Sequence, residues 1–184
     1  MGFDIHHGNH KLFYVLYGMD WKELLKTEID NTYRVASHLL DLVDENKMNW
    51  KPDTGSNWLT VGQLINHLTE ACGSNVKGFV TGDWSAFDAE GPLPPAESFL
   101  QADSVDQVRK KLQEDHDRTL DLLNECSEED LSKKLVSAPW DPKQAPLGQR
   151  ILQMIEHLKQ HKGQLYYYLK LQGKPVNTLD LWPN

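Results

Sequence analysis

The sequence predicts an all-α fold, a four-helix bundle with long irregular loops between consecutive helices. Two observations support this prediction. Four long segments repeat their apolar residues at intervals of three and four, the period of an amphipathic helix. The stretches between them are rich in Pro and Gly, which argues against a sheet of any size. A bundle is the natural way to bury four apolar stripes together.

The first predicted helix spans residues 20–44, where apolar side chains recur at the helical period. Residues 48–57 follow, and their Pro, Gly and Asn would end a helix and form a surface loop. Trp50 and Trp58 lie in or beside this loop, and we expect both rings to hold it against the bundle. The first connection is therefore predicted to be long and irregular.

The second predicted helix begins with the pattern of a capping box. Thr60 is the expected N-cap, and Gln63 stands three residues later, where its side chain can bond back to the cap. The apolar stripe continues to about Val80, so we expect one continuous helix with His67 on its inner face. Residues 81–103 contain several Gly, Pro and aromatic residues, which indicates a packed surface loop.

The third and fourth predicted helices are separated by a second Pro-rich loop. The third helix starts at the N-cap Ser104 and runs to about Asn124, with His116 on its apolar stripe. The loop includes residues 138–146, which carry three prolines. The fourth helix covers residues 147–171, and a Gly and then a Pro follow it closely, as is typical of a helix end.

Length and composition indicate one globular domain over residues 1–184. The chain is long enough to bury a core without disulfides, and 39% of its residues are hydrophobic and 25% charged. The 27 acidic and 19 basic side chains give a net charge of −8, which would repel a phosphate backbone. Basic residues occur in short runs, such as 109–111 and 133–134, next to acidic ones. We therefore expect no nucleic-acid partner.

The cysteines and the N-terminus indicate neither a redox motif nor a membrane protein. Cys72 and Cys126 are far apart and lack C-x-x-C spacing, so we expect both to be reduced. Residues 1–18 form an N-terminal extension without a basic segment that leads into an apolar run. No stretch of roughly eighteen apolar residues occurs. We expect a cytoplasmic protein with no membrane partner.

The N-terminal extension also contains a group of histidines, His6, His7 and His10. We expect these side chains to lie on solvent-exposed surface. The alternative is adventitious metal binding by a flexible arm.

Two histidines on the fourth predicted helix have the spacing of a chelate. His157 and His161 are four residues apart, so their Cβ atoms should lie roughly 5 to 6 Å apart on one face. Two histidines fall four apart by chance often enough, but His67 points inward from another helix. Imidazoles turned inward without a partner carry a desolvation cost unless something binds their nitrogens. We therefore predict that His67, His157 and His161 bind one divalent transition-metal ion.

Neighbouring residues leave other interpretations open. His67 alone would more often be a core residue that is hydrogen-bonded to a neighbour. His116 would close the coordination shell if it faced the same cavity, and a closed shell would favour a structural ion. Leu158 stands where the zinc-protease helix has its Glu base, which argues against a peptidase of that type. Gln164, one turn beyond His161, is a candidate to orient a ligand or a bound water.

Long stretches of the sequence resemble the DinB/YfiT-like family of metal-dependent bundle proteins, namely residues 56–68, 148–165 and 169–175. The resemblance covers nearly the whole chain after about Asp20. The metal-binding histidines of that family lie on the second helix and, at i and i+4, on the fourth. They correspond here to His67, His157 and His161.

The resemblance implies a zinc or nickel ion and, frequently, a homodimer. It also implies transfer or isomerisation chemistry with a small thiol such as bacillithiol, mycothiol or glutathione, which is the chemistry of the characterised relatives. Many other relatives have no known reaction. We expect a metal-dependent enzyme that activates a thiol or water nucleophile toward a small-molecule substrate, as a thiol transferase or a hydrolase. The alternative is a non-catalytic, metal-stabilised bundle that serves dimerisation or interaction. Residues 84–95 are an insertion particular to this chain. The resemblance therefore does not predict the rim of the pocket or the identity of the substrate.

Overall fold

The computed structural model describes residues 20–85, 87 and 94–182. The expectations for the N-terminal extension, residues 1–18, and for His6, His7 and His10 lie outside this part of the chain.

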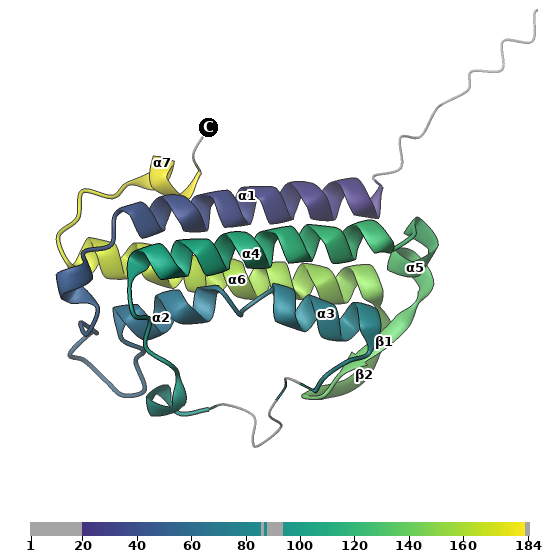
Figure 1. Ribbon diagram of the computed structural model, residues 1–184, viewed down its shortest axis with the longest axis horizontal. Coiled ribbons are helices and arrows are strands. Elements are labelled where there is room, and N and C mark those ends of the chain that lie inside the picture. The colour runs from purple at the N-terminus through teal and green to yellow at the C-terminus, as the bar shows by residue number, and fades with distance from the viewer. Residues whose placement is uncertain (1–19, 86, 88–93, 183–184) are drawn as a thin grey trace, which may run out of the picture.

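Four rods of helix build the molecule, and one rod is made of two helices placed end to end: α1 (Trp21–Asp41), α2 (Val61–Leu68) with α3 (Gly73–Thr81), α4 (Val105–Glu125) and α6 (Leu147–Leu171). Figure 1 shows the rods side by side, with α1 and α6 running in one direction and α2, α3 and α4 in the other. Helix α1 contacts α4 and α6, and both of these contact α2 and α3. The predicted four-helix bundle is confirmed.

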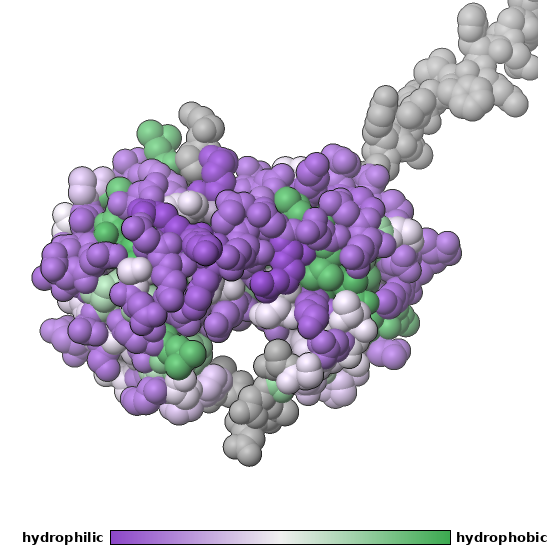
Figure 2. Space-filling model, in the orientation of Figure 1, coloured by the Kyte–Doolittle hydropathy of each residue, from purple (hydrophilic) through white to green (hydrophobic). Residues whose placement is uncertain are grey.

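Smaller elements connect the rods: η1 (Glu45–Lys47), η2 (Ala96–Ser98), α5 (Glu128–Lys133), β1 (Leu135–Ala138), β2 (Asp141–Pro146) and α7 (Thr178–Leu181). Figure 2 shows that this face of the molecule is mostly hydrophilic. The face is hollowed between the part that contains η2 and the part that contains the β1–β2 hairpin.

Two helix starts have the caps that the sequence predicts. The Thr60 hydroxyl accepts a hydrogen bond from the Gln63 N–H, and the Gln63 side chain accepts one from the Thr60 N–H at 2.9 Å. Ser104 caps α4 by accepting from the Gln107 N–H at 3.2 Å. Each cap satisfies an N–H group that the first turn of a helix leaves without a partner.

Apolar side chains from all four rods form one core. Cys72 and Cys126 are free and buried within it. Trp50 and Trp58 both pack edge-on against Tyr168, at centroid distances of 5.3 and 6.2 Å, so these rings do hold the first loop against α6. In the described part of the chain, every helix is too short or too polar to cross a bilayer.

The prediction of one continuous second helix up to about Val80 is wrong. Helix α2 ends at Leu68 and α3 begins at Gly73, so four residues interrupt the rod. At the start of the interruption, the Thr69 hydroxyl donates to the Asn66 carbonyl at 2.8 Å and competes with the helical ladder. The periodicity of the apolar residues persists across the break, and for this reason the sequence pattern does not reveal it.

The prediction of a plain Pro-rich loop over residues 138–146 is also wrong, because this stretch forms most of an antiparallel hairpin. Strand β1 pairs with β2 in the register Leu135↔Pro146, Val136↔Ala145 and Ala138↔Asp141, with an irregularity between Val136 and Ala138. Both strands of a two-stranded sheet are edges, and edges tolerate the missing N–H of proline. Proline density therefore excludes a large sheet but not a hairpin.

Candidate metal centre

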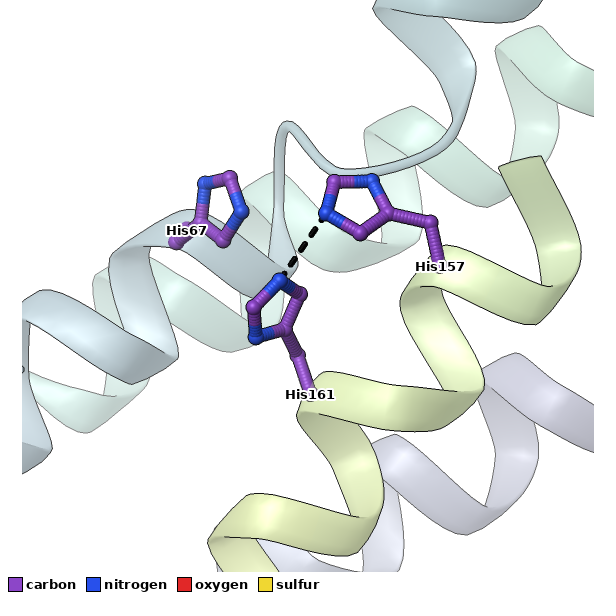
Figure 3. Close-up of side chains that lie close together, drawn as sticks. All are labelled: His67, His157 and His161. Carbon is purple, nitrogen blue, oxygen red and sulfur yellow. Dashed lines mark hydrogen bonds between the residues drawn. The ribbon is translucent and has the colours of Figure 1, made fainter. Parts of the chain in front are cut away.

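Helix α6 places His157 and His161 on successive turns of one face. Their ring centroids are 4.7 Å apart, and their Nε2 atoms approach to 2.9 Å. Figure 3 shows the two rings turned toward each other and toward α2. The predicted i, i+4 geometry is therefore present, and both imidazoles can reach a common point.

The third histidine of the predicted set joins this pair from the last turn of α2. The centroid of the His67 ring lies 4.5 Å from that of His161 and 5.4 Å from that of His157. On its other side the His67 ring packs edge-on against Phe99, at a centroid distance of 5.1 Å. One nitrogen from each of the three histidines lies within 4.8 Å of the others. We call these residues the histidine trio.

The second nitrogen of His157 determines which tautomer this ring adopts. Its Nδ1 lies 3.0 Å from the carbonyl oxygen of Ala71. A carbonyl oxygen can only accept, so Nδ1 must carry the hydrogen and Nε2 must keep its lone pair. The Ala71 carbonyl lies in the break between α2 and α3, outside the helical ladder, and therefore accepts from side chains, since the Asn75 Nδ2 also donates to it at 3.4 Å.

A chain of hydrogen bonds determines the tautomer of His161. The Tyr168 hydroxyl donates to the Leu59 carbonyl at 2.9 Å, and it accepts from the Gln164 Nε2 at 3.2 Å. This contact turns the amide so that the Gln164 Oε1 faces the His161 Nδ1, at 3.2 Å. Because Oε1 can only accept, the hydrogen of His161 is on Nδ1 and its Nε2 also keeps a lone pair.

The two Nε2 lone pairs of His157 and His161 therefore face each other across 2.9 Å with no proton between them. This arrangement is unfavourable unless a cation lies among the nitrogens. Three imidazole nitrogens around one zinc ion at its usual bond length would be separated by about 3.3 Å. The His157 and His161 Nε2 atoms are 2.9 Å apart, and the three ligand nitrogens all lie within 4.8 Å of one another, so small side-chain movements suffice. The residues fit a divalent transition metal with nitrogen preference.

The electrostatics of the trio favour neutral rings. Burial and the nearby His161 and His157 rings lower the pKa of His67 to about 3. Burial also lowers the pKa of His157, and burial together with His157 lowers the pKa of His161. Neutral imidazole is the form that binds metal, so protons compete weakly with a cation at neutral pH.

His116 lies elsewhere in the bundle. Its Nε2 is 2.9 Å from the Asp30 Oδ1, and its ring packs against Tyr33 at a centroid distance of 5.1 Å. These contacts lie between α4 and α1, whereas the trio lies between α2 and α6. In the described part of the chain, no fourth His, Cys, Asp or Glu joins the trio. The structure thus does not place His116 where it would close the coordination shell.

Several residues around the trio carry no clear signal in the sequence and were not predicted. Tyr168 stands four residues after Gln164, so helical spacing alone could have suggested their contact. The carbonyls of Ala71 and Leu59 carry no residue-type signal, because every residue offers the same acceptor. Phe99 lies in a predicted loop, and its contact with His67 depends on the path of that loop.

Comparisons with known proteins bear on the family and on the fold. The sequence profile of the DinB superfamily matches residues 28–165, a span that contains the whole trio. The fold resembles the crystal structure of a DinB-like protein, YjoA, from Bacillus subtilis. That comparison has a TM-score of 0.60 and 15% sequence identity, and it covers 82% of this chain and 92% of that chain. At this identity the likeness concerns the fold alone. No functionally curated protein matches the chain.

Proposed function

The chain belongs to the DinB superfamily. From this premise we propose that it is a metal-dependent enzyme whose His67, His157 and His161 hold one zinc or nickel ion. The supporting observation is that the hydrogen bonds of the outer ring nitrogens leave the lone pairs of His157 and His161 directed at each other. A divalent cation would accept both lone pairs.

The ligand set argues for a working site rather than a purely structural ion. Three protein ligands leave at least one coordination position for a water or a substrate, whereas structural zinc is usually closed by four ligands. The described residues supply no fourth ligand of the usual types. Cys72, the cysteine nearest to this region in sequence, is fully buried, and its thiol lies beside Tyr33 and Asp115 instead.

A metal bound here would lower the pKa of a thiol or water ligand and make it a nucleophile at neutral pH. The protein's own part is to hold three neutral imidazoles in position. The Ala71 carbonyl orients His157, and the Gln164 amide orients His161. In thiol transfer, the sulfur–carbon bond forms as the bond from carbon to the leaving group breaks, and the thiol proton passes to solvent. A low-molecular-weight thiol is the proposed co-substrate, and a small electrophile is the substrate.

Cobalt substitution tests this proposal. Protein loaded with Co²⁺ should show ligand-field absorption, and glutathione should add an intense charge-transfer band as its sulfur enters the open position. The alternative function, a metal-stabilised interaction module, predicts that glutathione leaves the spectrum unchanged. A spectrum that responds neither to glutathione nor to azide would contradict an open site and favour that alternative.

We also propose that the chain forms a homodimer. Tyr167 and Leu171 lie one turn apart on α6 and are 63% and 66% exposed. Adjacent exposed apolar side chains of this size are suited to an interface. Sedimentation of the wild type and of Tyr167→Lys tests this: a dimer that dissociates in the variant supports the assignment, and a wild-type monomer refutes it.

A further inference from the structure

The break between α2 and α3 is held from two sides. On the side of the trio, the Ala71 carbonyl accepts from the His157 Nδ1 at 3.0 Å. On the opposite side, the Gly73 N–H donates to the Asp115 Oδ2 of α4 at 3.0 Å. The two peptide groups flank Cys72, so one short segment connects a histidine of the trio with a carboxylate of another helix.

Asp115 is built into this position. Its side chain is 1% exposed, and its Oδ2 also accepts from the Tyr33 hydroxyl at 2.6 Å. Cys72, the N-cap residue of α3, makes no side-chain cap bond, so the carboxylate of Asp115 takes the place of a cap. A Cβ at Gly73 would lie 2.3 Å from the Asp115 Oδ1, so the close approach requires glycine.

We propose that Asp115 is a positioning residue for the metal centre: it keeps the rod broken at residues 69–72 and thereby keeps the Ala71 carbonyl available to His157. Its effect on metal binding rests on the proposed function above, whereas its effect on the His157 tautomer does not.

The alternative conformation of this segment explains the mechanism. In a continuous helix the Ala71 carbonyl would accept from the backbone N–H of Asn75, four residues later. The apolar periodicity of the sequence favours that continuous helix. Asp115 opposes it by binding the Gly73 N–H from outside the helix. Without Asp115 the buried N–H would lack a partner, and winding the segment into the helix would satisfy it at the expense of His157.

The test compares three variants. Asp115→Leu removes both acceptor oxygens and keeps the branched shape of the side chain, and the Tyr33 hydroxyl retains Thr119 Oγ1, at 3.2 Å, as a partner. Asp115→Asn keeps one acceptor oxygen that can face Gly73. Tyr33→Phe deletes a different bond to the same carboxylate and leaves the Gly73 contact intact. The last two variants are therefore matched controls for loss of stability alone.

Two readouts are measured in protein shown to be folded by circular dichroism. Long-range ¹H–¹⁵N spectra of the metal-free protein report the tautomer of His157. We expect the Nδ1–H form in the wild type and both controls, and a mixture of tautomers in Asp115→Leu. Zinc affinity, measured by chelator competition, should fall tenfold or more in Asp115→Leu and stay within about threefold in the controls.

A folded Asp115→Leu variant that keeps the Nδ1–H form and wild-type zinc affinity would overturn the inference. If Asp115→Leu does not fold, Gly73→Ala decides, because its Cβ displaces the same carboxylate without removing it. An unchanged His157 tautomer in that variant would likewise overturn the inference. If the wild type binds no zinc, the proposed function fails, and the tautomer comparison in metal-free protein still decides the role of Asp115.

Discussion

The histidines in the described part of the chain have two kinds of surroundings. His38 and His116 are each paired with a carboxylate: Asp180 lies 2.9 Å from His38, and Asp30 lies 2.9 Å from His116. The histidine trio has no carboxylate partner among the described residues. The outer nitrogens of His157 and His161 meet neutral acceptors, and their inner nitrogens meet each other.

This difference separates a satisfied histidine from a candidate ligand. An imidazole beside an acid can donate its N–H or take a proton, so it needs nothing further. A group of neutral imidazoles that converge without an acid has the arrangement that a transition-metal cation binds. The groove between α1 and α4, of about 500 Å³, is lined by both His38 and His116, yet their nitrogens already have acidic partners. Available space is therefore a poorer guide here than the pairing of donors and acceptors.

The largest expected effect comes from removing one member of the trio. His161→Ala should abolish stoichiometric metal in purified, untagged protein reconstituted with zinc, because two imidazoles on separate helices form a much weaker site. Elemental analysis by mass spectrometry measures the metal content.

The acid-paired histidines supply the controls for this experiment. His38→Ala and His116→Ala should keep one metal ion per chain, because neither ring faces the trio. Equal metal content in all three variants would refute the distinction between the two kinds of histidine.

The next effect concerns the neutral acceptor behind His161. Gln164→Leu removes the Oε1 that accepts from Nδ1, so either tautomer becomes accessible. Loss of such an outer partner typically lowers metal affinity 10- to 100-fold, and we expect a decrease of about that size. Chelator competition measures the affinity.

Gln164→Glu is the matched control, because its carboxylate still accepts from the His161 Nδ1. The Tyr168 hydroxyl keeps its bond to the Leu59 carbonyl in both variants. Affinity in Gln164→Glu should equal or exceed that of the wild type. A wild-type affinity in Gln164→Leu would show that the Gln164 contact does not matter for metal binding.

The pH dependence of stability tests the electrostatics of the trio in metal-free protein. The pKa of His67 in the folded chain is lowered to about 3. As the pH falls below about 6.5, the usual pKa of a histidine, the unfolded chain therefore binds a proton at this residue before the folded chain does. The contribution of His67 to the free energy of unfolding should therefore be fully present above pH 6.5 and decrease from there toward pH 3. The free energy of unfolding can fall by at most about 1.4 kcal/mol per pH unit for each proton that only the unfolded chain binds.

Urea unfolding of the wild type and of His67→Gln, between pH 7 and pH 5, measures this contribution. The variant should show the smaller decrease, because it lacks one of the neutral rings. Protonation of Asp115 changes the free energy of unfolding in the opposite direction, because burial raises the pKa of this carboxyl in the folded chain. Asp115 is present in both proteins, so its contribution cancels in the comparison. Equal slopes would contradict the lowered pKa of His67.

Local signals in the sequence were enough for much of the fold. The apolar periods locate the four rods, the Thr60–Gln63 capping box starts α2, and the residues of α6 are those predicted. The proximity of His157 and His161 also follows from helical spacing, and His67 lies on the predicted inner face of its own helix. These features depend on residues a few positions apart, where side-chain geometry is nearly determined by the chain itself.

The remaining features depend on distant partners. The break in the second rod relies on Asp115, which lies 42 residues after Gly73. Hairpin formation and the start of α6 involve a backbone bond from Leu147 to Lys134, on opposite sides of the β1–β2 hairpin. The orientation of Gln164 relies on the Leu59 carbonyl, 109 residues before Tyr168. Periodicity and propensity do not contain such information, since it exists only once the bundle has formed.

The smallest expected effect is on the acid-paired side of the comparison. Asp30→Asn removes the carboxylate at 2.9 Å from His116, in a pair whose side chains are 20% and 47% exposed. Ion pairs at this exposure contribute roughly 0 to 1 kcal/mol, so the midpoint of urea unfolding should hardly move. Zinc content should remain at one ion per chain, because Asp30 touches no member of the trio. A loss of zinc in Asp30→Asn would mean that the α1–α4 groove and the trio are coupled, and the two kinds of histidine would then have to be treated as one system.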